Sequence, residues 1–191
     1  MSSIFQSYAN KVCQILDRYD WGPVETLAEN LKTCWECNRQ VFVCGNGGSA
    51  ANAVHMANDF LYGVASNVDG PGIRIEALSS NTAVLTCLAN DVGYEQVFSE
   101  QLRVKAQTND VLVCLSGSGN SENIVRALTI GSELNMSTYA ILGYSGGRCL
   151  ELADVAIHFP INDMQIAEDL QLVVAHMCMQ WVKEKSNKCA R

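Results

Sequence analysis

Several features that define whole classes of protein are missing from this sequence. It has no apolar run approaching the ~20 residues that a membrane-spanning helix needs. Its first residues are polar and lack the basic segment and apolar run of a secretory signal. Acidic residues outnumber basic ones by 20 to 13, and the net charge of −7 disfavours binding to nucleic acid. We therefore expect a cytoplasmic protein that binds neither membranes nor nucleic acids.

Signatures of nucleotide binding and of disulfide scaffolds are also missing or incomplete. No G-K-S or G-K-T sequence occurs, which argues against a nucleoside triphosphate held with magnesium. Nine cysteines, an odd number at irregular spacing, are typical of reduced thiols in a cytosolic protein. Cys34 and Cys37 form one C-x-x-C near the end of a helical pattern. That position favours two packed thiols over a redox pair or half of a zinc site.

The sequence does contain enough apolar residues for one sizeable core. Its 191 residues are 48 % hydrophobic and 17 % charged, which excludes global disorder and fits a single domain, 1–191. Residues 4–37 show apolar residues at helical spacing, with a break at Trp21-Gly22-Pro23. Because this N-terminal region carries apolar residues that one sheet need not bury, we expect it to form contacts in a homo-oligomer.

Short apolar runs then alternate with helical patterns along the rest of the chain. Strands are predicted at 40–44, 73–78, 110–115, 138–142 and 154–159. Helices are predicted at 48–61, 81–89, 94–107, 121–135 and 164–185. Such alternation implies right-handed crossovers and a mostly parallel sheet with helices on both faces. The predicted fold is a three-layer α/β domain.

Two loops, one rich in glycine and one in serine, each follow a predicted strand and open a helix. Gly45-Asn46-Gly47-Gly48-Ser49-Ala50 would let the backbone approach an anion closely. Its spacing also fits the G-x-G-x-x-A dinucleotide fingerprint, and a tight turn without a ligand is the structural alternative. Ser116-Gly117-Ser118-Gly119-Asn120-Ser121 adds three hydroxyls that could meet on one phosphate. Two such loops favour a small phosphorylated metabolite. A dinucleotide-binding fold would use the first loop alone and would have an acidic residue at the end of the second strand, whereas Glu76 lies inside its strand.

Two predicted helices carry a candidate acid–base and metal-binding set. His55 and Asp59 are four residues apart and share one helix face. Glu168 and Asp169 precede His176 by about two turns on a broadly shared face. Histidines and carboxylates suit zinc, and they also suit the proton transfers of an aldose–ketose isomerisation through an enediol. A surface ion pair of His55 with Asp59, beside a packed His176, is the alternative interpretation.

The runs GNGGSAANAVH, LANDVGY and LSGSGNS, followed by a late helix with His176, resemble the phosphoheptose isomerase branch of the SIS (sugar isomerase) family over nearly the whole chain. The resemblance implies a five-stranded parallel sheet with flavodoxin-like connections and a homotetramer. It implies conversion of sedoheptulose 7-phosphate to D-glycero-D-manno-heptose 7-phosphate, for lipopolysaccharide or capsule heptose. Asp59 would be the base and His176 the acid, in a zinc site of His55, Asp59, Glu168 and His176. The implied sugar-phosphate site comprises Asn46, Gly47, Gly48, Ser49, Asn90, Asp91, Ser116, Gly117, Ser118, Ser121 and Glu168.

The sequence departs from the family pattern at four positions. Asp59 stands where the family has Glu, Glu168 where it has Gln, Gly117 where many members have Thr, and Gly63 where an arginine is common. These departures leave open isomerisation of another phosphosugar. Some SIS proteins of this shape are non-catalytic regulators that bind a partner protein. The acid–base set favours an enzyme, because a pure binding module has no need for it.

Overall fold

Five parallel strands form the centre of the computed structural model, which describes residues 3–66 and 70–187. They are β1 (Gln40–Gly45), β2 (Arg74–Ala77), β3 (Val111–Ser116), β4 (Ser137–Leu142) and β5 (Val155–His158). Their order in the sheet is β2-β1-β3-β4-β5, and every neighbouring pair is parallel. All six residues of β3 are buried, as a central strand covered on both faces requires. The predicted three-layer α/β fold is confirmed.

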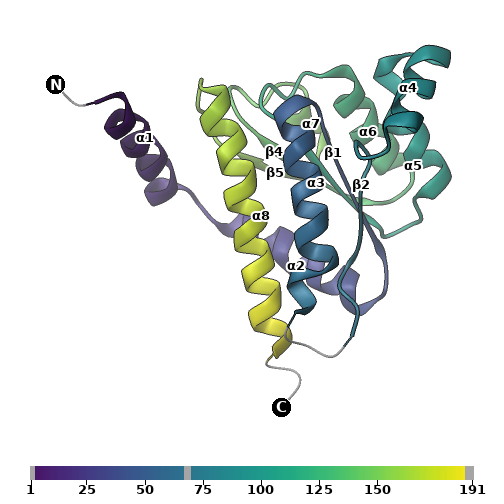
Figure 1. Cartoon of the computed structure of the whole chain (residues 1–191), viewed down its shortest axis with the longest axis horizontal. Helices are drawn as coiled ribbons and strands as arrows, with labels where there is room; N and C mark the ends of the chain where they lie inside the picture. Colours follow the sequence, from purple (N-terminus) through teal and green to yellow (C-terminus); the bar gives the residue numbers. More distant parts are fainter. Residues whose placement is uncertain (1–2, 67–69, 188–191) are drawn as a thin grey trace.

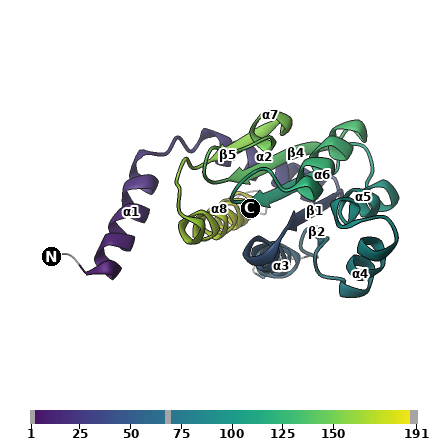
Figure 2. The ribbon, with the colours of Figure 1, turned by 90° about the horizontal axis from the view of Figure 1, so that it is seen from above.

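Helices cover both faces of this sheet (Figures 1 and 2). One face carries α2 (Gly22–Glu36), α3 (Gly47–Leu61) and α8 (Met164–Asn187), which share a core with Val41 and Val113. The other face carries α4 (Thr82–Asp91), α5 (Ser99–Lys105), α6 (Glu122–Glu133) and α7 (Cys149–Leu152). Phe42 and Leu112 belong to this second core. Successive strand residues thus point into different cores, as the pleat dictates.

Most predicted elements agree with the structure to within a few residues, but one predicted helix does not. The segment 94–107 is divided into a short 3₁₀ helix, η2 (Tyr94–Gln96), and α5. Val97 and Phe98 lie between the two and are fully buried. The chain turns there to bring both side chains into the core. A second 3₁₀ helix, η1 (Gly63–Ala65), follows α3.

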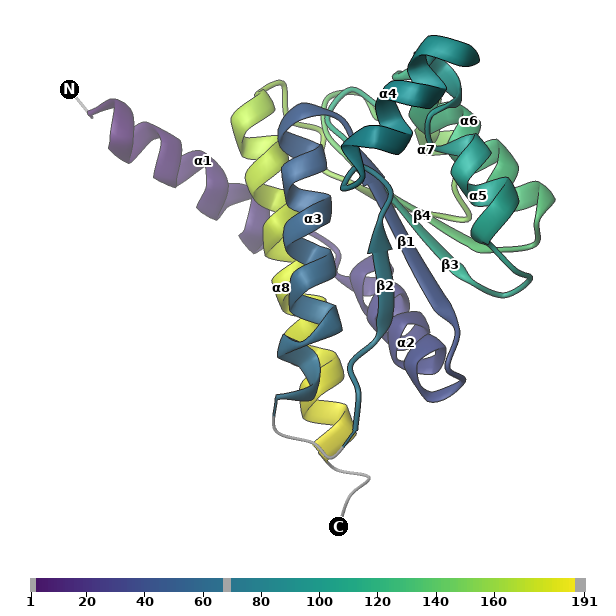
Figure 3. The ribbon, with the colours of Figure 1, turned by 45° about the vertical axis from the view of Figure 1, so that its right-hand side comes forward.

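The first helix, α1 (Ile4–Arg18), projects from the body of the domain beside α8 (Figure 3). It has no buried residue, and Ile4 and Phe5 are 78 % and 83 % exposed. Its Tyr8 hydroxyl donates to Oδ2 of Asp169 at 2.5 Å, and this hydrogen bond raises the pKa of Tyr8 to about 12. Tyr8 therefore stays a neutral donor that holds α1 against α8, while the start of the helix leaves apolar side chains in solvent.

The C-x-x-C sequence lies at the end of α2, as predicted. Cys34 is buried on the helix, and burial raises the pKa of its thiol to about 12. Cys37 follows the last helical residue and is exposed. A thiol with so high a pKa has almost no thiolate at neutral pH, so Cys34 is a packing residue. No helix in the described part of the chain is both long and apolar enough to cross a membrane.

The strand order brings the two motif-bearing loops together. β1 and β3 are neighbours in the sheet, yet the chain leaves β1 toward β2 and leaves β3 toward β4. In an open sheet of order 2-1-3-4-5, such a reversal opens a crevice at the carboxyl ends of the two strands. Residues 45–50, the glycine loop, and residues 116–121, the serine loop, follow these two strands. Both loops therefore lie at the switch point.

Candidate active site

The glycine loop and the serine loop line one cavity of about 240 Å³. The remaining walls come from the end of β3 and from the first two turns of α8. Its lining residues are Asn46, Gly47, Gly48, Ser49, Leu115, Ser116, Gly117, Ser118, Ser121, Met164 and Glu168. Every predicted sugar-phosphate residue except Asn90 and Asp91 is among them. A cavity at the switch point of an α/β sheet is the expected place for a ligand.

The serine loop is arranged as a cradle for an anion. The Ser116 hydroxyl oxygen accepts a hydrogen bond from the Gly119 N–H at 3.0 Å, and that of Ser118 accepts one from the Asn120 N–H at 3.3 Å. Both hydroxyls thereby fix the loop and keep their own protons for donation. Ser121 occupies the N-cap position of α6 but makes no capping hydrogen bond with its side chain. Three hydroxyl donors and the positive end of α6 thus surround one space.

Two asparagines link the glycine loop to α6, the helix that follows the serine loop. The Asn46 side-chain amide donates to Oδ1 of Asn123 at 2.9 Å, and the Asn123 amide donates back to Oδ1 of Asn46 at 2.8 Å. The hydroxyl of Tyr94, from η2, also donates to Asn46 Oδ1 at 2.8 Å. Asn123 is 2 % exposed, so its amide groups depend on this pairing. The side chain of Asn46 is therefore engaged in positioning the loops.

The sequence did not single out Asn123 or Tyr94. Asn123 lies two residues beyond the serine loop and Tyr94 ends the run LANDVGY, but nothing in a single sequence pairs either of them with Asn46 across the fold. Asn90 and Asp91, by contrast, were predicted for the site but lie on the exposed last turn of α4, outside the cavity. The Asn90 side-chain amide donates to Oδ1 of Asp91 at 2.8 Å. Within one chain, these two side chains therefore hydrogen-bond to each other and do not contribute to the cavity wall.

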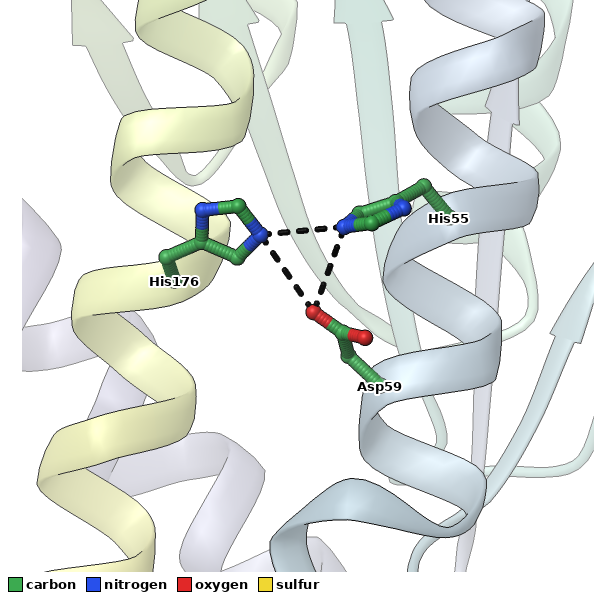
Figure 4. A group of neighbouring side chains, drawn as sticks. All are labelled: His55, Asp59 and His176. Atoms are coloured by element: carbon green, nitrogen blue, oxygen red, sulfur yellow. Dashed lines mark hydrogen bonds and ion pairs between the residues drawn. The ribbon is translucent and has the colours of Figure 1, made fainter.

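His55, Asp59 and His176 converge between two helices (Figure 4). His55 and Asp59 come from α3, and His176 faces them from α8. The two imidazole Nε2 atoms are 3.0 Å apart, and each is 3.4 Å from Oδ2 of Asp59. The imidazoles are 47 % and 46 % exposed, whereas the carboxylate is 19 % exposed. The ion pair of His55 with Asp59, which was the alternative interpretation from the sequence, does form. His176 joins this pair from α8, so it is not an isolated surface pair.

This triangle of donor atoms fits a zinc ion. Ligand atoms bound tetrahedrally at the usual Zn–N and Zn–O lengths lie about 3.3 Å from one another. The observed edges of 3.0 and 3.4 Å match that spacing. Three protein ligands with one position left for water or substrate are typical of catalytic zinc sites. Without a cation, the two facing Nε2 atoms can approach this closely only as a hydrogen bond, in which one nitrogen carries the proton and the other accepts it.

Glu168, predicted as a fourth ligand, lies apart from these three residues. Its carboxylate rests against Gly48, at the start of α3, so closely that a methyl group on Gly48 would overlap both carboxylate oxygens. Its backbone carbonyl accepts a hydrogen bond from the Asn52 side-chain amide at 3.0 Å. The structure thus brings three of the four predicted ligands together and places the fourth in the wall of the loop cavity.

Comparison with known proteins assigns the chain to a family. Residues 5–143 match the family model of the SIS domain. The chain belongs to the SIS domain family. It is 36 % identical over 167 residues to the phosphoheptose isomerase of Helicobacter pylori (strain Shi470), and the aligned region covers 87 % of this chain and 84 % of that protein. It is 32 % identical over 163 residues to the phosphoheptose isomerase of Trichlorobacter lovleyi, covering 85 % and 82 %.

A solved structure supports the same assignment for this SIS domain. Phosphoheptose isomerase GmhA from Neisseria gonorrhoeae superposes with a TM-score of 0.86 at 28 % identity, covering 93 % of this chain and 94 % of that one. The predicted family and its phosphoheptose isomerase branch are confirmed. The prediction of an enzyme also agrees with relatives that are themselves isomerases.

One departure of this SIS domain from the family pattern has a steric explanation. A Cβ atom at Gly117 would lie 2.6 Å from the sulfur of Met164 and 3.8 Å from Cε2 of Tyr144. Met164, the first residue of α8, therefore occupies the space that a threonine side chain at position 117 would need. The sequence showed the missing hydroxyl but could not show what fills its place. The cavity wall at this point is a thioether.

Proposed function

We propose that this SIS domain is an aldose–ketose phosphosugar isomerase that converts sedoheptulose 7-phosphate to D-glycero-D-manno-heptose 7-phosphate. The main support is that the loop cavity and the group of His55, Asp59 and His176 are built on the same two helices, α3 and α8. His55 lies seven residues beyond Gly48, about 10 Å along the helix axis. A substrate with its phosphate in the cavity and its reacting carbons at Asp59 must be long, which favours a seven-carbon sugar.

The proposed chemistry is a pair of proton transfers. Asp59 removes a proton from C1 of the open-chain ketose while His176 donates one to the oxygen on C2, which gives the enediol. Asp59 then returns its proton to C2, and His176 takes the proton from the oxygen on C1, which gives the aldose. Each residue starts and ends in the same protonation state, and no other reactant is consumed.

The same residues would hold the zinc ion. His55 and His176 would bind it through Nε2, and Asp59 through Oδ2, because these are the atoms that converge. A bound zinc ion would polarise the carbonyl group and stabilise negative charge on its oxygen. His176 bound through Nε2 would have only its Nδ1 proton left to donate, and Asp59 bound through Oδ2 would have only Oδ1 left to accept one. Metal binding and proton transfer therefore compete at these two residues. His55 has only a binding role in this scheme.

Incubation of the purified protein with sedoheptulose 7-phosphate tests this function directly. Chromatography should show conversion to an aldose phosphate of equal mass, and elemental analysis of the same sample should show bound zinc. Thermal shifts with the sugar phosphate and with NAD separate a phosphosugar site from a dinucleotide site. Tight binding of the sugar phosphate without conversion, in zinc-loaded protein, would favour a non-catalytic binding domain.

Replacement of Ser118 by alanine should weaken phosphosugar binding by about tenfold or more, because it removes one hydrogen bond to a charged group. The hydroxyl lines the cavity and accepts only one long hydrogen bond within the loop, from the Asn120 N–H at 3.3 Å. The fold should therefore survive. Calorimetric titration with sedoheptulose 7-phosphate measures the change, and an unchanged affinity would place the phosphate elsewhere.

We also propose that α1 contributes to a homotetramer. Its exposed Ile4 and Phe5 would be covered by another copy of the chain, which removes their apolar surface from water. Light scattering at micromolar protein concentration should give the mass of four chains. Replacing both residues by serine should shift that mass downward without unfolding the domain, since neither side chain is buried within the chain. A monomeric mass for the unaltered protein would contradict the proposal.

A further inference from the structure

The start of α3 is faced by a carboxylate that belongs to the chain itself. Glu168 is half-buried in the cavity wall, with its carboxylate against Gly48 in the first turn of α3. Asn46, the N-cap residue of this helix, makes no capping hydrogen bond with its side chain. A negative charge at the first turn is favourable because the free N–H groups there carry partial positive charge. Glu168 thus occupies the position where the glycine loop would otherwise attract an anion.

The cavity therefore has two walls of opposite electrostatic character. The serine loop presents the hydroxyls of Ser116, Ser118 and Ser121 at the positive end of α6. The wall formed by α8 and the start of α3 presents the carboxylate of Glu168. An ionised carboxylate can only accept hydrogen bonds, so it needs a donor from the ligand. It also repels a second anionic group, and this repulsion is strong where water is partly excluded.

We propose that Glu168 makes the cavity selective for sugars with one phosphate, held by the serine loop, and with a hydroxyl group facing the carboxylate. Ligands that carry a second anionic group at that end are rejected. The inference rests on the proposed function for the position of the phosphate on the serine loop. It assigns to Glu168 a specificity role, separate from the proton transfers at Asp59 and His176.

Two ligands of matched length test this selectivity. Glycerol 3-phosphate and 3-phosphoglycerate each carry one phosphate on three carbons, but the far end is a hydroxyl in the first and a carboxylate in the second. Their dissociation constants are measured by calorimetry or by ligand-detected NMR. The wild-type protein should bind glycerol 3-phosphate at least tenfold more tightly. In Glu168→Gln the ratio should fall to about one, because the side chain keeps its size, loses its charge and gains N–H donors.

Asp169→Asn is the matched control. It removes the same charge from the adjacent position on α8, where the carboxylate accepts from Tyr8 and does not line the cavity. This variant should keep the wild-type ratio. If Glu168→Gln also keeps it while glycerol 3-phosphate still binds, the selectivity proposal is overturned and the proposed function stands. If the wild-type protein binds neither ligand nor sedoheptulose 7-phosphate, the phosphate position is wrong and both proposals fall.

Discussion

Replacement of His176 by alanine is expected to abolish isomerisation of sedoheptulose 7-phosphate. The change removes the proposed acid, and loss of general acid–base catalysis alone costs about 10²–10⁴-fold in rate. It also leaves only His55 and Asp59 of the three converging ligands, so bound zinc should fall in parallel. Phosphosugar binding should persist, because the cavity between the glycine and serine loops does not include His176. Turnover, zinc content and calorimetric affinity are the three measurements.

Gln180→Ala is the control for this substitution. Gln180 is exposed one turn further along α8 and belongs neither to the triangle of donor atoms nor to the cavity. Its replacement should leave rate, zinc content and affinity unchanged. Wild-type turnover by the His176 variant would show that the catalytic assignment is wrong, even though membership of the SIS domain family would stand.

A second large effect is expected from Gly119→Ala, which acts on the backbone of the serine loop. Gly119 has a φ of 65°, and a methyl group there would overlap the carbonyl oxygen of Gly146. Its own N–H donates to Ser116 Oγ, and its carbonyl accepts from the Cys149 N–H at 3.0 Å. Strain and overlap together should lower the free energy of unfolding by about 2–4 kcal/mol. The loop must shift, so phosphosugar affinity should fall by more than about tenfold.

Gly47→Ala separates backbone strain from steric overlap. Gly47 lines the same cavity with a φ of 54°, but nothing lies within 4 Å of the position that a Cβ atom would take. Only the cost of the left-handed conformation remains, about 1–2 kcal/mol. Urea unfolding of both variants compares the two costs. Equal destabilisation would mean that contact with Gly146 plays no part in holding the serine loop.

Periodicity was sufficient to predict a three-layer α/β domain with a mostly parallel sheet, whereas the five-stranded, flavodoxin-like arrangement was predicted from the family resemblance. Buried strands such as 110–115 and amphipathic helices can be recognised from short stretches of sequence, because the spacing of their apolar residues follows the repeat of the strand or helix backbone. The division of 94–107 was missed because it depends on the burial of Val97 and Phe98, which the rest of the core decides. The glycine and serine loops could be recognised because each is a continuous run between a strand and a helix.

The sequence by itself determined that two loops and a set of histidines and carboxylates are present. Only the tertiary structure decided which of them meet. The packing of α3 on α8 brings His176 to His55 and Asp59 and turns Glu168 toward Gly48. The start of α8 also lies against the serine loop, which sets Met164 over Gly117. Helical spacing could not distinguish these outcomes for Glu168 and His176, because two turns of one helix can face different neighbours. Contacts between residues more than a hundred positions apart depend on how whole helices are rotated and packed, and no local pattern records that.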